Sequence, residues 1–97
     1  MPSKADSWHA SCVERLLHAR GLEHLRARSR GALVTIESGP DDDPIPHARL
    51  RRDTVHLWLV EIADHRGRWG PTPIRANLET AIVCLHSDYG WVLTPID

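Results

Sequence analysis

At residues 55–62 the sequence reads Val55-His56-Leu57-Trp58-Leu59-Val60-Glu61-Ile62, the most apolar run in the chain. Eight residues rich in β-branched and aromatic side chains, with polar turn residues on both sides, predict a β-strand. Alternation divides its apolar side chains between two faces, which carry Val55, Leu57 and Leu59 on one side and Trp58, Val60 and Ile62 on the other. Because both faces are apolar, we expect this strand to lie at the centre of one sheet.

The length and composition of the chain are those of one globular domain. Of its 97 residues, 41% are hydrophobic and 26% are charged, which is too apolar for a disordered chain. No apolar run approaches the roughly 18 residues of a membrane span, and the N-terminus lacks the apolar core of a signal peptide. Cys12 and Cys84 lie in apolar helical patterns, which favours reduced thiols. We expect a single cytoplasmic domain over residues 1–97, with no metal and no cofactor.

The rest of the sequence predicts an α+β fold. Apolar residues at helical spacing predict an N-terminal helix over residues 6–20, and a second helix over residues 78–87. Between them, residues 22–38 and 55–70 predict two hairpins, and prolines 71 and 73 confine the last return strand to a sheet edge. We expect an antiparallel sheet of about four to five strands, followed by a short extended tail over residues 91–96.

The first predicted hairpin has a basic face. A turn at Arg30-Gly31, with Ser29 paired to Ala32, collects the apolar side chains on one face. The other face then carries basic residues, with Glu37 across from the first of them: His24, Arg26 and Arg28. Further arginines extend this surface: Arg30, Arg49, Arg51 and Arg52.

Arginine makes up eleven of the twelve basic residues. Its planar guanidinium suits bidentate contacts with phosphate or carboxylate, so the basic residues predict a surface that binds nucleic acid or another polyanion. Two plainer explanations stay open. A GC-rich genome encodes arginine in place of lysine, and arginine opposite Glu37 is ordinary cross-strand pairing.

The second predicted surface is apolar. Two helices can cover only one face of the sheet, and we expect them to pack on the side of Val55, Leu57 and Leu59. Pairing Ala63 with Arg68 then leaves an open patch that consists of Trp58, Val60, Ile62 and Trp69. Such a patch is typical of an interaction hot spot, so we expect a homodimer or a subunit of a larger complex, unless the C-terminal tail covers the patch.

An enzyme is the alternative. His24 with Arg26, Arg28 and Glu37 supplies the acid–base group and the cations of a small metal-independent ribonuclease or toxin-like enzyme. The sequence contains no G-x-S-x-G, H-E-x-x-H or P-loop motif, and the acidic run 41–43 lacks the spacing of a calcium loop. We therefore expect a non-catalytic binding or accessory protein.

The central segment also carries a resemblance. Leu57-Trp58-Leu59, followed by Asp64-His65-Arg66-Gly67-Arg68-Trp69 and a C-terminal helix, resembles a group of small bacterial proteins that form a domain of unknown function. The likeness covers residues 22–93. Because that group has no assigned activity, the resemblance implies an α+β fold and a bacterial origin, and it implies no functional residues.

Overall fold

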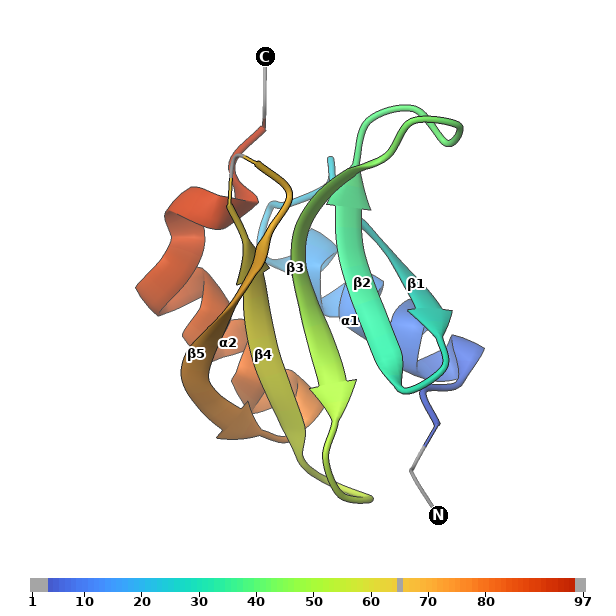
Figure 1. Cartoon of the computed structure of the whole chain (residues 1–97), viewed down its shortest axis with the longest axis vertical. Coiled ribbons are helices and arrows are strands. Elements are labelled where there is room, and N and C mark those ends of the chain that lie inside the picture. The colour runs from blue at the N-terminus through green and yellow to red at the C-terminus, as the bar shows by residue number, and fades with distance from the viewer. Residues whose placement is uncertain (1–3, 65, 96–97) are drawn as a thin grey trace.

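The computed structural model describes residues 4–64 and 66–95, so His65 in the predicted turn and Ile96 in the predicted tail lie outside it. The elements follow one another along the chain (Figure 1) as α1 (Ser7–Ala19), β1 (Arg26–Arg30), β2 (Leu33–Ser38), β3 (Ile45–Arg52), β4 (Trp58–Ala63), β5 (Trp69–Ala76), α2 (Leu78–Tyr89) and the 3-10 helix η1 (Gly90–Leu93). The five strands form one antiparallel sheet in the order β1-β2-β3-β4-β5. This confirms the α+β prediction. The predicted extended tail instead begins with η1.

Both helices cover the same face of the sheet (Figure 1). Helix α1 packs against β1 and β2, while α2 packs against β4 and β5, and η1 contacts β3. The core between these layers is apolar and includes Val13, Leu17, Ile36, Leu50 and Leu85. No helix in the described part of the chain is long and apolar enough to cross a membrane.

Local sequence explains several element boundaries. Asn77 caps α2, because its side-chain oxygen accepts a hydrogen bond from the Thr80 backbone N–H at 2.8 Å. Pro71 and Pro73 lie in β5, which is an edge strand, as predicted, since neither proline can donate to a neighbouring strand. β3 begins at Ile45, two residues inside the loop predicted over residues 39–46.

The face prediction for the central strand was wrong. Trp58 and Val60 are only 2% and 1% exposed and belong to the core under the helices, whereas Val55 lies in a loop before β4 and is 62% exposed. Leu59 lies on the open face. Because β4 is apolar on both sides, packing decides the choice, and burial of the large Trp58 indole favours the observed arrangement.

The register of the second hairpin also differs from the prediction. Ala63 pairs with Trp69, not with Arg68, so Ile62 pairs with Gly70. A slip of one residue moves a side chain to the other face of a sheet, and Trp69 therefore lies on the open face, away from Trp58. The predicted apolar interface patch does not form. Association as a homodimer or within a larger complex stays a prediction.

The first hairpin keeps its predicted faces in a different register. Ser29 pairs with Val34, and Arg26 pairs with Glu37, a shift of two residues from the predicted pairing. The turn lies at Gly31-Ala32, where Gly31 adopts a φ of 58° that favours glycine. Because side chains alternate with a period of two, a shift of two residues leaves every side chain on its predicted face.

The buried side of α1 was predicted only in part. Val13 and Leu17 are buried as expected, but Trp8 is 62% exposed and His9, expected in solvent, is 3% exposed. His9 lies four and eight residues before Val13 and Leu17, so helical geometry places all three on one stripe. The imidazole takes the core position because its Nδ1 accepts a hydrogen bond from the Asp6 backbone N–H at 2.9 Å.

Candidate polyanion-binding face

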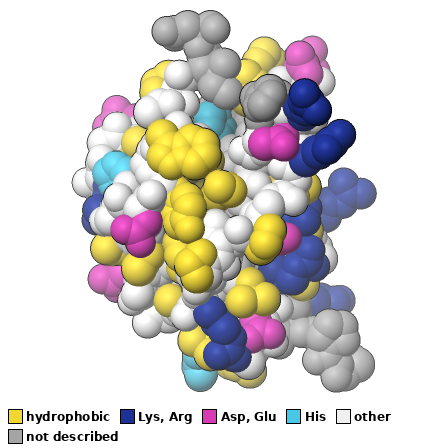
Figure 2. Space-filling view, turned by 60° about the vertical axis from the view of Figure 1, so that its left-hand side comes forward, with side chains coloured by type: hydrophobic (Ala, Val, Ile, Leu, Met, Phe, Trp, Pro, Cys, Tyr) yellow, Lys and Arg dark blue, Asp and Glu magenta, His cyan; other side chains and the backbone are white. Residues whose placement is uncertain are grey.

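The face of the sheet that carries no helix is rich in arginine. Three strands supply its guanidinium groups, and we define the basic face by these residues: Arg26, Arg28 and Arg30 from β1, Arg49 and Arg51 from β3, and Arg75 from β5. In the space-filling view, Lys and Arg side chains gather toward the right-hand side, beside a column of hydrophobic side chains (Figure 2). The strands thus bring together arginines that are up to 49 residues apart in the sequence.

The strand registers order these side chains into rows across the sheet. One row alternates arginine with leucine and reads Arg30, Leu33, Arg51, Leu59 and Arg75. Neighbouring strands are about 4.8 Å apart, so successive arginines in this row are separated by roughly 10 Å at the backbone. The result is a two-dimensional array of cations on an apolar ground, not a single line along one hairpin.

At the β1 end of the face, two arginines share one buried carboxylate. Arg26 Nε and Arg28 Nε lie 3.2 Å and 2.7 Å from Glu37 Oε1, and Glu37 is only 6% exposed. Asp41, in the following loop, lies 3.3 Å from Arg28 Nη2. The pairing keeps both guanidinium groups against the sheet and confirms that Arg26 and Glu37 lie on one face.

The centre of the face repeats this arrangement around Glu61. Arg49 Nε donates to Glu61 Oε1 at 2.9 Å, and Arg51 Nη2 donates to the same oxygen at 3.4 Å. The hydrogen bond from Arg49 lowers the pKa of Glu61, so this carboxylate stays charged at neutral pH. Arg49 Cζ also lies 4.3 Å from the centre of the Trp69 ring, which is a cation–π contact.

The ion pairs leave the face with an excess of positive charge. Each of the two glutamates is shared by two arginines, and Arg75 Nε lies 2.7 Å from Asp53 Oδ2. Arg30 makes no ion pair with another residue among those described. Surface pairs of this kind contribute little to stability, so phosphate oxygens can replace the carboxylates as partners.

Two of the predicted basic residues lie elsewhere. Arg52 follows Arg51 in β3, so its side chain projects to the helix side, where Nη1 donates to the Lys4 carbonyl at 2.6 Å. His24 precedes β1 and is not part of the strand; its Nε2 donates to the Leu93 carbonyl at 2.7 Å. Sequence reasoning missed Arg75 and Trp69 on the basic face, because both positions depend on the register of β5.

The predicted catalytic residues are not brought together. Arg26 and Arg28 surround Glu37 on the basic face, whereas the His24 ring faces His47 at 6.2 Å between ring centres and bonds to η1. Within the described residues there is no group of three or more His, Cys, Asp or Glu side chains that could hold a metal ion.

A buried serine–histidine pair lies beside His24 and was not foreseen. Ser38 Oγ donates to His47 Nε2 at 2.7 Å, and His47 Nδ1 donates to the Val92 carbonyl at 2.7 Å. Burial lowers the pKa of His47, which keeps the ring neutral and suited to accept from Ser38. Both side chains are buried, so the pair fastens η1 to the sheet and presents no nucleophile to solvent.

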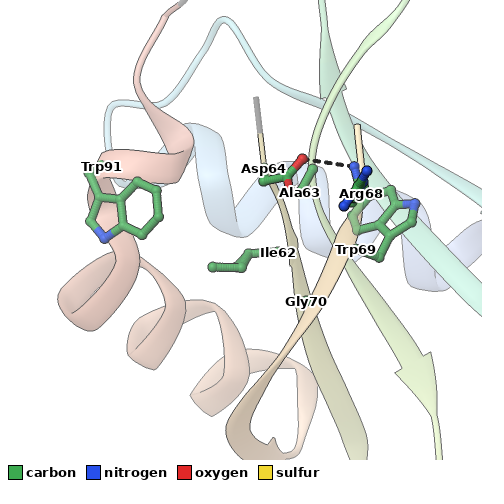
Figure 3. A pocket seen from close by; sticks show the side chains of 7 residues that line it. All are labelled: Ile62, Ala63, Asp64, Arg68, Trp69, Gly70 and Trp91. Carbon is green, nitrogen blue, oxygen red and sulfur yellow. Dashed lines mark hydrogen bonds between the residues drawn. The ribbon is translucent and has the colours of Figure 1, made fainter. Parts of the chain in front are cut away.

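Two residues of the predicted interface patch border a hollow at the β5 edge. Ile62, Trp69 and Trp91 line this cavity of about 540 Å³. Ile62 points toward Trp91, while the Trp69 side chain lies on the far side of the β5 ribbon (Figure 3). The two indoles are therefore not neighbours, and the hollow has one exposed aromatic wall, formed by Trp91.

No family model, curated protein or solved structure matches the chain, so no activity or site residue passes to it from a relative.

Proposed function

We propose that this protein is a non-catalytic accessory protein that binds nucleic acid through the basic face. The observation that carries the proposal is the open sheet face, on which six arginines from three strands lie without a covering helix. Nucleic acid is the polyanion whose phosphate charges repeat over the width of such an array, and release of condensed counterions favours binding.

The contacts between Arg49, Trp69 and Glu61 support single-stranded nucleic acid in particular. Trp69 offers an aromatic surface on the same face as the arginines, and an unpaired base stacks on such a ring. Stacking adds affinity that a duplex, with its bases inside, does not gain. Arg49 then holds a phosphate or shares the stack, while Glu61 keeps its guanidinium in place before binding.

Fluorescence anisotropy of a labelled oligonucleotide, measured at increasing salt concentration, tests the proposal. The double variant Arg30→Ala/Arg51→Ala removes two basic-face arginines whose side chains are exposed or half-exposed. We expect weaker binding and a smaller salt dependence, by about 0.7 for each lost phosphate contact to a single strand. The matched control is Arg15→Ala/Arg20→Ala, which removes the same charge from α1 and the turn after it.

Two results would contradict the proposal. One is the absence of oligonucleotide binding by wild type at low salt. The other is an equal loss of affinity in the control variant, because binding would then follow net charge and not the basic face.

A further inference from the structure

A second site lies on the helix side of the sheet, where α1 and α2 both begin. Residues of α1, β3, the β3–β4 loop, β4 and α2 surround a cavity of about 460 Å³ there. Its apolar walls come from Trp8, Val55, Trp58 and Leu78. Trp8 and Val55 are two of the large hydrophobic side chains that the fold leaves exposed, and both border this one cavity.

His9 supplies an unused hydrogen-bond donor to the cavity. The ring is 97% buried between Trp8, at 3.8 Å between ring centres, and Trp58, at 5.0 Å. Since Nδ1 accepts from the Asp6 backbone, the proton of the neutral ring lies on Nε2. That nitrogen donates to no described residue, although buried donors are nearly always paired.

Arg52 supplies a second donor and a positive charge in the same wall. Its Nη1 and Nη2 donate to the carbonyls of Lys4 and Val55 at 2.6 Å and 2.9 Å, and its Cζ lies 5.7 Å from the Trp58 ring centre. The remaining nitrogen, Nε, is buried and donates to no described residue. An unpaired buried donor costs free energy that an acceptor brought by a ligand would recover.

We propose that this cavity binds a small aromatic carboxylate. The ring of the ligand stacks on Trp8 and contacts Val55 and Leu78, and its carboxylate accepts from His9 Nε2–H and, after a rotation of the guanidinium, from Arg52 Nε–H. Two donors match the two oxygens of one carboxylate. A phosphate dianion fits less well, because two N–H groups of Arg52 are already in use and the Glu79 carboxylate borders the cavity.

Titration of the ¹⁵N-labelled protein with 2-naphthoate, followed by NMR, tests this site independently of nucleic-acid binding. We expect millimolar affinity and shifts of the His9 Nε2–H and Arg52 Nε–H signals. The neutral probe 2-naphthalenemethanol has the same ring and lacks the charge, so we expect it to bind at least about tenfold more weakly.

Two exposed tryptophans allow a matched comparison of variants. Trp8→Ala removes the stacking wall and should weaken 2-naphthoate binding by about tenfold, whereas Trp91→Ala, at the far hollow, should leave it unchanged. Both side chains are largely exposed, so neither variant should unfold the protein. Absence of the two side-chain shifts, equal affinity for acid and alcohol, or an equal effect of the two variants would overturn the proposal.

Discussion

Replacement of Trp58 by alanine tests the most consequential feature of the fold, the face of β4 that the helices cover. The Trp58 side chain is 2% exposed and packs against His9 and Arg52, so its removal leaves a large cavity between the sheet and α1. Large aromatic-to-alanine changes in a core cost about 3–5 kcal/mol. A domain of this size is stable by only about 5–15 kcal/mol, so the loss is a large fraction of the total.

Leu59→Ala is the matched control, since Leu59 neighbours Trp58 in β4 and projects to the half-exposed open face. We expect it to cost no more than about 1–2 kcal/mol. Each kcal/mol lowers the melting temperature of a domain this small by about 4–8 °C, so Trp58→Ala should melt at least about 10 °C below Leu59→Ala. Thermal unfolding followed by circular dichroism measures both. A lower melting temperature for Leu59→Ala would show that the helices cover the other face.

Two further predictions concern charged and titratable groups. Burial lowers the pKa of His9 and His47 below the ordinary 6.5, so the unfolded chain binds protons more readily than the folded one; stability should be constant above about pH 6.5 and fall as the pH drops below it, and urea unfolding from about pH 7.5 to about pH 5 should show a shallower decline in His47→Gln. Arg26→Ala/Arg28→Ala should lower the free energy of unfolding by about 1–3 kcal/mol, because Glu37 is left buried without a cation, and addition of Glu37→Gln should restore most of the loss; an unchanged melting temperature in the double variant would refute the buried pairing.

Local patterns were sufficient where one face of an element is clearly polar. In β1 the alternation of Arg26 and Arg28 with Ala27 allows only one orientation toward the core, and the arginines lie on the predicted face even though the pairing register is shifted by two residues. In β5 the two prolines exclude a central strand by themselves. The α+β architecture and much of the basic face follow from constraints of this kind.

The remaining features depend on contacts between segments far apart in the chain. β4 is apolar on both faces, so alternation cannot tell which face the helices cover, and that choice depends on how well Trp58 fits against α1. His24 leaves the basic row to bond with Leu93, 69 residues away. A one-residue difference in the β4–β5 register moves Trp69 to the basic face. The sequence by itself determined the elements and the polar faces, because side-chain alternation and backbone chemistry are local. Only the tertiary structure decided which apolar face is buried, since the free energy of burial belongs to the assembled layers.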